Sequence, residues 1–152
     1  MAATVSTVEG ATIHGLLDQQ AGEEADAPAL VFPKERLTYG EYAALTRLAA
    51  RRLRALGVGP GDKVGILQHG GVDMIVSMIG VMRLGAVAVP VNARYKSTEL
   101  RYLVEHADLQ VLLVDESFVA VVIESFPELV DATPGPLALA AAPELRHIVG
   151  PM

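Results

Sequence analysis

One long run of apolar residues constrains the fold more than any other part of the chain. Residues 71–92 read GVDMIVSMIGVMRLGAVAVPVN, and between Val72 and Leu84 only three side chains are polar. A helix that is apolar on nearly every side is buried or crosses a membrane, and this one is too short for a bilayer, which needs about 20 apolar residues. We therefore predict a buried helix over residues 72–84, ended by Gly85 as a left-handed cap, and then a buried strand.

Strand and helix patterns recur along the rest of the chain. Thr38 and Glu41 form a capping box, and the helix that follows repeats apolar residues at helical spacing up to Leu56. Ser97 is the expected N-cap of a helix that runs to about His106. Further helices are predicted over residues 12–20 and 115–126, and strands over residues 29–32, 63–67, 86–89, 110–114 and 146–149. This alternation predicts an α/β fold with a mainly parallel sheet flanked by helices.

We expect the chain to form a single incomplete domain over residues 1–152. Its 152 residues are enough for one hydrophobic core. Residues 1–10 should be poorly ordered, as termini often are, and residues 127–143 should be an irregular connection because they contain four prolines. A new strand begins at about Arg146, so we expect the chain to be a fragment of something longer.

Composition excludes several classes of function. The net charge of −6 argues against nucleic acid as the main partner, and the absence of cysteine excludes disulfides and thiolate metal sites. The N-terminus lacks a basic segment followed by an apolar core, so we expect no secretory signal, no membrane span and a cytoplasmic location. The apolar fraction of 51% is high, which indicates apolar faces covered by further polypeptide or by a second copy in a homodimer.

Two strand ends carry candidate functional residues. His69, Gly70 and Gly71 lie between a strand and the buried helix, the order in which parallel sheets bind ligands, so His69 could line a cleft. The alternative, a tight loop with a polar tip, is favoured because the tripeptide has low specificity. Asp115 and Glu116 follow another strand, where an acid could serve catalysis. Capping of the next helix is their favoured role, because helix N-termini attract negative charge.

Other patterns predict no site. The glycines of residues 57–61 end a helix and precede a strand, which is the reverse of the order in a phosphate-binding loop. The four histidines lie in separate segments without metal-ligand spacing, so we predict no metal site. Arg47, Arg51 and Arg54 form a stripe on one helix that could bind anions. A solvated outer face is favoured, because the chain is acidic overall.

Three segments together resemble one known family. LTYGEY at residues 37–42, RLGAVAVPVNARYKSTEL at residues 83–100 and VLLVD at residues 111–115 are similar to the adenylate-forming family of AMP-dependent acyl-CoA synthetases and ligases. The match extends over about residues 13–149. It implies the N-terminal portion of the large domain of an enzyme that joins a carboxylic acid to AMP and then to coenzyme A. The resemblance implies ATP, Mg²⁺ and coenzyme A as cofactors of the full-length enzyme.

The resemblance also implies what this chain does not carry. The family's phosphate loop, its later nucleotide-binding motifs and its catalytic lysine lie downstream of the matched segments. We therefore expect no catalytic residue here, no cofactor bound to this fragment and no activity of the fragment alone. Its partners would be the remainder of its own polypeptide and a small-molecule carboxylic acid from fatty acid or aromatic acid metabolism. The His-Gly-Gly tripeptide departs from the family's commoner asparagine-serine loop, so it receives no role.

Arg94 and Lys96 are the candidate binding residues. Two cations in a loop before a helix could contact the phosphates of coenzyme A, and the resemblance places this loop near the thiol-substrate entrance in some members. Ordinary solvated cations are the alternative. At the level of function, the alternative is a stand-alone flavodoxin-like binding module without catalytic activity. The strand that begins at about Arg146 argues against that alternative.

Overall fold

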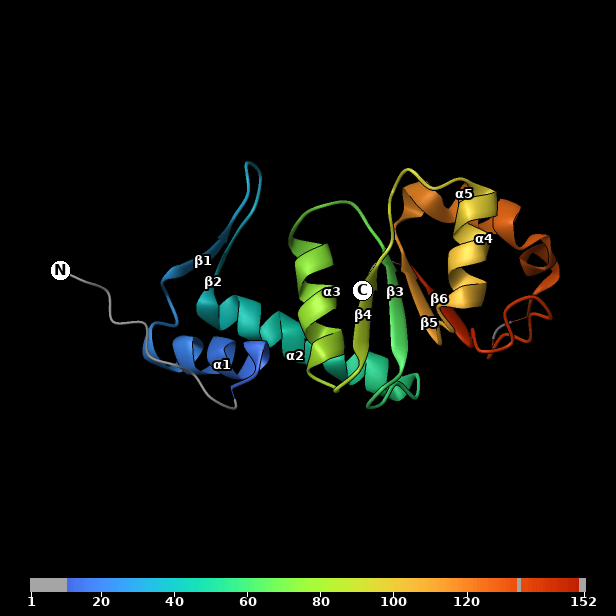
Figure 1. The fold of residues 1–152 in the computed structure, drawn as a ribbon. Helices are drawn as coiled ribbons and strands as arrows, with labels where there is room; N and C mark the ends of the chain where they lie inside the picture. Colours follow the sequence, from blue (N-terminus) through green and yellow to red (C-terminus); the bar gives the residue numbers. More distant parts are fainter. Residues whose placement is uncertain (1–10, 134, 151–152) are drawn as a thin grey trace. The chain divides into compact units, whose positions relative to one another are not determined.

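The computed structural model describes residues 11–133 and 135–150. Residues 1–10, for which we expect poor order, lie outside the described residues. The chain divides into two compact units, Met1–Ala44 and Leu45–Met152, whose elements are labelled along the chain in Figure 1. The helix α2 (Tyr39–Ala55) passes from the first unit into the second.

The first unit contains a helix, α1 (Ile13–Glu23), and a two-stranded antiparallel hairpin. The hairpin strands are β1 (Pro28–Val31) and β2 (Arg36–Thr38). The predicted capping box is confirmed at the start of α2, because the Thr38 N–H donates to Glu41 Oε2 at 2.8 Å and the Glu41 N–H donates to Thr38 Oγ1 at 3.3 Å. The strand β2 was not predicted, since its three residues are too few for an alternating pattern.

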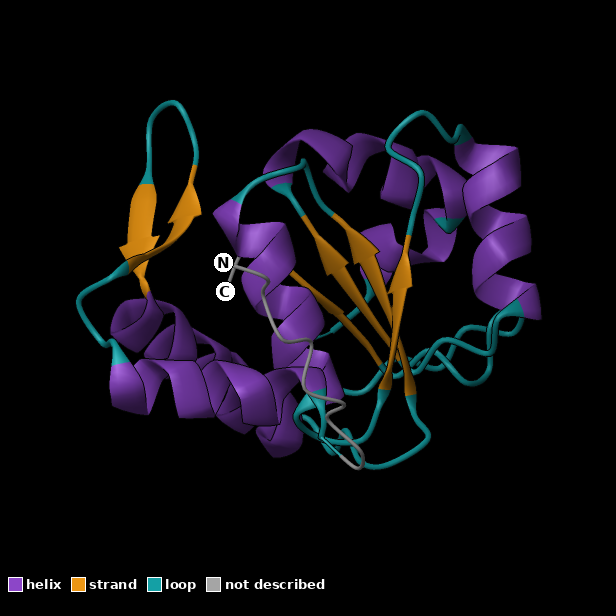
Figure 2. Ribbon diagram, turned by 60° about the vertical axis from the view of Figure 1, so that its left-hand side comes forward, coloured by secondary structure: helices purple, strands orange, loops and turns teal. Residues whose placement is uncertain are grey.

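The second unit is built on a four-stranded parallel sheet with the strand order β4-β3-β5-β6. The strands are β3 (Lys63–Leu67), β4 (Val87–Pro90), β5 (Val111–Val114) and β6 (His147–Val149). Each lies within one residue of its predicted position, so the α/β fold with a mainly parallel sheet is confirmed. Figure 2 shows the strands between helices on both sides.

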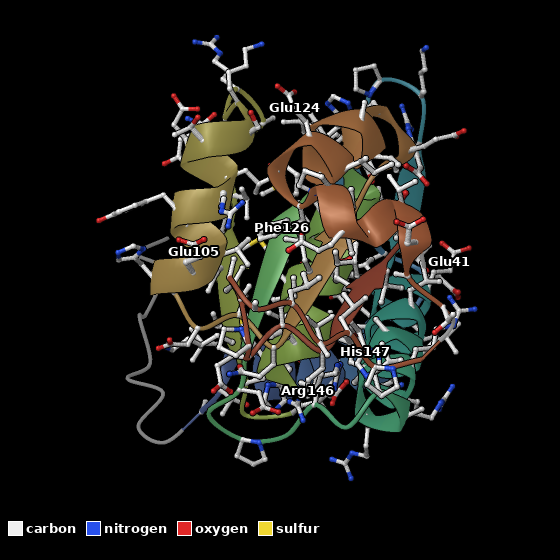
Figure 3. The ribbon with its side chains drawn as sticks, turned by 90° about the vertical axis from the view of Figure 1, so that its right-hand side faces the viewer. Glu41, Glu105, Glu124, Phe126, Arg146 and His147 are labelled. Atoms are coloured by element: carbon white, nitrogen blue, oxygen red, sulfur yellow. The ribbon has the colours of Figure 1, made fainter. Side chains whose placement is uncertain are left out.

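The two faces of the sheet belong to two separate hydrophobic clusters. Val64 and Ile66 of β3 face a cluster formed with α2 and α3 (Val72–Met82), whereas Leu67 belongs to the opposite cluster. That cluster is formed with α4 (Ser97–His106) and α5 (Val119–Ser125), and Phe126 lies within it between these helices (Figure 3). Because side chains alternate along a strand, strands that read as continuous apolar runs are buried on both faces.

The helix α3 is the most buried of the described helices, as predicted. From residue 72 to residue 84 only Asp73 is exposed. A Cβ atom on Gly80 would lie 2.7 Å from Ala49 Cβ, so α2 and α3 approach closely there. The helix ends at Met82 rather than Leu84, and Gly85 has the predicted left-handed conformation with φ of 69°.

None of the helices in the described residues combines the length and apolar character that a membrane span requires.

Two further predictions about helix boundaries were wrong. Ser97 is the first residue of α4 rather than its N-cap, and the preceding Lys96 N–H donates to Glu99 Oε2 at 2.9 Å. The helix predicted over residues 115–126 is divided into a 3₁₀ turn, Glu116–Phe118, and α5. This interruption places Ser117 and Phe118 against His69, a tertiary contact that the local sequence does not reveal.

The predicted irregular connection over residues 127–143 contains a short 3₁₀ helix, Pro127–Asp131, followed by turns and one isolated bridge between Leu139 and Ala142. Beyond it the chain returns to the sheet as β6. Arg146, at the lower end of the sheet in Figure 3, forms an ion pair with Asp62, with Nη2 and Oδ2 3.2 Å apart. The end of the connection is therefore tied to the turn that precedes β3.

Candidate functional site

Three loops leave the same edge of the parallel sheet. Residues 68–71 follow β3, residues 91–96 follow β4, and residues 115–118 follow β5. The strands are parallel, so these loops all start at their carboxyl ends, to which the arrowheads point in Figure 2. Open parallel sheets bind ligands at this edge, which makes it the candidate site.

His69 joins the loops that follow β3 and β5. Its backbone N–H donates to Asp115 Oδ2 at 2.6 Å, and its Nε2 lies 2.9 Å from Ser117 Oγ. The imidazole also contacts the Phe118 ring, with the two centroids 4.6 Å apart. The favoured sequence interpretation of Asp115 was wrong, since its side chain does not cap the following turn but accepts a hydrogen bond from a distant loop.

The pairing of His69 with Ser117 does not amount to a nucleophilic dyad of the serine hydrolase type. In such a site an acid orients the second ring nitrogen, and backbone donors stabilise the oxyanion. Here Asp115 binds the His69 backbone, and Nδ1 has no hydrogen-bond partner among the described residues. The arrangement is suited to holding two loops together.

The glycines of the first loop leave open space beside it. A Cβ atom added to Gly70 or Gly71 would meet no atom within 4 Å, and neither residue has a φ in the left-handed region. Neither glycine is therefore required by the backbone conformation or by close packing. His69 is exposed at the sheet edge, and its backbone is bonded to Asp115 in the loop that follows β5.

Arg94 and Lys96 lie in the loop after β4. Asn92 shapes this loop, because its Oδ1 accepts from the Arg94 N–H at 3.0 Å and its carbonyl accepts from the Tyr95 N–H at 3.0 Å. The side chains of Arg94 and Lys96 are exposed and form no ion pair with a described residue. Two positive charges are thus presented to solvent beside the carboxyl edge of the sheet.

A fourth arginine lies beside the arginine stripe of α2. Arg83, which follows α3, lines a pocket of about 300 Å³ together with Arg47, Arg51 and Arg54. Its Nε donates to Thr46 Oγ1 at 2.9 Å. The sequence could not place Arg83 there, since it follows a different helix. Among the described residues, no three histidine, aspartate, glutamate or cysteine side chains are grouped so that they could hold a metal ion.

Gln68 is a feature that sequence reasoning missed. It follows the last residue of β3 and is only 4% exposed, and its Oε1 has no hydrogen-bond partner in the described part of the chain. Buried polar groups without partners are rare in native proteins. The available signal was a glutamine that directly extends an apolar strand.

Comparison with known proteins places this geometry in context. A sequence model of the family described as AMP-binding enzyme matches residues 17–147. The chain is 35% identical to 3-hydroxybenzoate–CoA ligase of Aromatoleum sp. (strain CIB) over 120 residues, which cover 79% of this chain and 23% of that protein. It is 34% identical to tyrocidine synthase 3 of Brevibacillus parabrevis over 102 residues, which cover 67% of this chain and 2% of that protein.

A solved structure shares the fold. The anthranilate CoA ligase AuaEII, in complex with anthranoyl-AMP, matches with a TM-score of 0.76 and 27% sequence identity over 90% of this chain and 24% of that chain. The present chain therefore spans about a quarter of the length of both CoA ligases and a much smaller part of the tyrocidine synthase.

Proposed function

The chain belongs to the AMP-binding enzyme family, and from this premise we propose that it is the N-terminal part of an AMP-forming acid–CoA ligase. In the proposed reaction a carboxylate displaces pyrophosphate from ATP to give an acyl-adenylate. The thiol of coenzyme A then displaces AMP to give the acyl thioester. The observation that carries the proposal is the likeness over 90% of this chain to a CoA ligase that holds an acyl-adenylate.

We infer that the acid is aromatic. Two of the similar proteins are named for aromatic acids, 3-hydroxybenzoate and anthranilate. A fatty acid is the alternative within the same chemistry. The described residues do not themselves form a pocket that identifies the acid, so this choice rests on the relatives.

The described residues do not fit ATP or Mg²⁺. The glycines of residues 57–61 follow α2 and precede β3, and the Gly59 N–H donates to Asp62 Oδ2 at 3.0 Å instead of pointing toward a ligand. In the described part of the chain, no three histidine, cysteine or carboxylate side chains are grouped so that they could hold a metal ion. Nucleotide binding is therefore assigned to polypeptide outside this chain, and we derive no step of adenylation from these residues.

Arg94 and Lys96 fit a contact to coenzyme A. Both side chains are exposed and without an ion-pair partner among described residues, so binding a phosphate would not require breaking an internal contact. A charge-assisted bond to phosphate is among the stronger hydrogen bonds in proteins. Because both lie at the carboxyl edge of the sheet, a phosphate held there would lie on the side where parallel sheets bind ligands.

The remainder of the polypeptide is the proposed partner of an apolar groove beside β6. This groove has a volume of about 430 Å³, and its lining includes Val119, Ile123 and Leu129. Val119 is 44% and Ile123 is 39% exposed, which is unusual for clustered apolar side chains. We propose that both units form a single incomplete domain and that further polypeptide, or a second copy, covers this groove. A cytoplasmic location is part of the same proposal.

The proposed activity is tested with the complete gene product. The protein is incubated with ATP, Mg²⁺, coenzyme A and one acid at a time, chosen from benzoate, 3-hydroxybenzoate, anthranilate and octanoate. We expect AMP and an aromatic acyl thioester to form in equal amounts. Preference for octanoate would overturn the aromatic assignment, and adenylation without thioester formation would overturn the coenzyme A step. A stand-alone binding module is not favoured, and it would release no AMP with any acid.

A further inference from the structure

A small cavity includes in its lining the residue that follows β3. Its polar lining consists of Gln68 after β3, Arg52 from α2, and Asp73 and Ser77 from α3, and its volume is about 50 Å³. Polar residues from three separate elements therefore line one space. Leu48 and Val76 contribute apolar walls, so a polar group placed inside has a defined set of partners.

One of these polar groups is buried without a hydrogen-bond partner among the described residues. Gln68 is 4% exposed and its Oε1 accepts no hydrogen bond from a described residue. Ser77 is also buried and is 3% exposed. A buried amide oxygen that lacks a donor is destabilising, so Gln68 Oε1 calls for a ligand that donates a hydrogen bond to it.

The charges and hydrogen-bonding groups around the cavity determine which kind of ligand fits it. Gln68 Oε1 requires a hydrogen-bond donor, and Arg52 offers only donors, so a ligand here must both donate and accept. A metal cation is disfavoured because the Arg52 guanidinium lines the same space, and an anion is disfavoured by the amide oxygen and by Asp73. Water donates two hydrogen bonds and accepts two, and the volume exceeds the 10–15 Å³ or so that one water requires.

We propose that this cavity binds ordered water, which donates to Gln68 Oε1 and contacts Ser77 Oγ. The water connects the end of β3 to α3, with Arg52 and Asp73 closing its outer side. It fixes the point from which the His69 loop starts. Buried waters of this kind complete the hydrogen bonding of polar groups that the fold leaves unpaired.

The sign of a stability change tests the proposal. Gln68→Met keeps the length of the side chain and removes its amide. If water satisfies Oε1, we expect the folding equilibrium constant, measured by urea unfolding of the complete gene product, to fall about fivefold. If Oε1 is unpaired, the substitution should instead increase stability, which would overturn the proposal.

Gln110→Met is the matched control for that measurement. Gln110 Oε1 accepts from the Lys63 N–H, so its loss reports the effect of removing a glutamine with a known protein partner. We expect both variants to lose stability. A loss in Gln110→Met together with a gain in Gln68→Met would identify Gln68 as an unsatisfied group and overturn the proposal.

A crystal structure of the complete gene product at high resolution tests the ligand directly. We expect a solvent molecule at about 2.7–3.2 Å from Gln68 Oε1 and in contact with Ser77 Oγ, with the density of a water rather than of a metal ion. An Arg52 guanidinium bonded directly to Oε1, or no ordered solvent within that distance, would overturn the proposal.

Discussion

The backbone N–H of His69 donates a 2.6 Å hydrogen bond to the carboxylate of Asp115, a residue 46 positions later in the chain. This contact joins the carboxyl ends of two adjacent parallel strands, β3 and β5. The ring of His69 adds contacts to Ser117 and Phe118 at the same junction. Two of the three loops at the edge where parallel sheets bind ligands are therefore joined by these contacts.

Asp115→Ala should lower the free energy of unfolding by about 1–2 kcal/mol, because the His69 N–H loses a charged acceptor. Asp115→Asn keeps a neutral acceptor and should lose less. Urea unfolding measures both. The neighbouring Glu116→Ala is the control, since Glu116 is exposed and its loss should change stability by less than about 0.5 kcal/mol. Equal losses at the two positions would show that the contact contributes nothing.

Arg94→Ala in the complete gene product should raise the KM for coenzyme A by about 10- to 150-fold, the range expected for one charge-assisted contact to phosphate. The KM for ATP should not change. Arg54→Ala, which removes an exposed arginine from the stripe on α2, is the control for a general loss of positive charge. The measurement belongs at low salt, where screening is weak, and an unaltered KM for coenzyme A would remove Arg94 from the site.

The 152-residue chain by itself should not form an acyl-adenylate. Adenylation requires donors and a metal ion arranged around the phosphates of ATP, and the described residues do not fit either ligand. The measurement is acid-dependent release of pyrophosphate from ATP, compared with a heat-denatured sample. Release above that background would place catalytic groups within this chain.

The isolated chain should associate with itself through the apolar groove beside β6. Ile123→Glu places a charge in that groove and should shift the chain toward monomer, which light scattering over a range of concentrations can measure. Val31→Glu is the control, because Val31 is 60% exposed on β1 and does not line the groove. If the unsubstituted chain remains monomeric throughout, neither the homodimer nor self-association through this surface is supported.

Gly80→Ala should destabilise the chain by about 1–2 kcal/mol. The added Cβ would lie 2.7 Å from Ala49 Cβ, and the strain of overpacking two rigid helices exceeds the gain in helix propensity. Gly22→Ala is the matched control, since Gly22 is also helical and an added Cβ meets no atom within 4 Å. Thermal unfolding should show a loss for the first variant and a small gain for the second. A gain in both would mean that α2 and α3 can separate at little cost.

Patterns within single segments determined most of the fold. The apolar runs of β3, β5 and α3 predicted their positions within one or two residues, because burial on both faces leaves no place for polar side chains. The capping box at Thr38 depends on residues three apart, so the local sequence contains all of it. The family also followed from sequence, since its motifs are contiguous segments.

Only the tertiary structure decided which polar groups meet. The His69–Asp115 contact joins residues from different strands, and the cavity at Gln68 draws on three separate elements. The same dependence explains why the helix predicted after β5 was wrong at its start, where Ser117 and Phe118 contact His69. Side-chain periodicity indicates which face of a helix or strand is buried. Which residues of other elements pack against that face depends on strand order and on how the crossover helices pack.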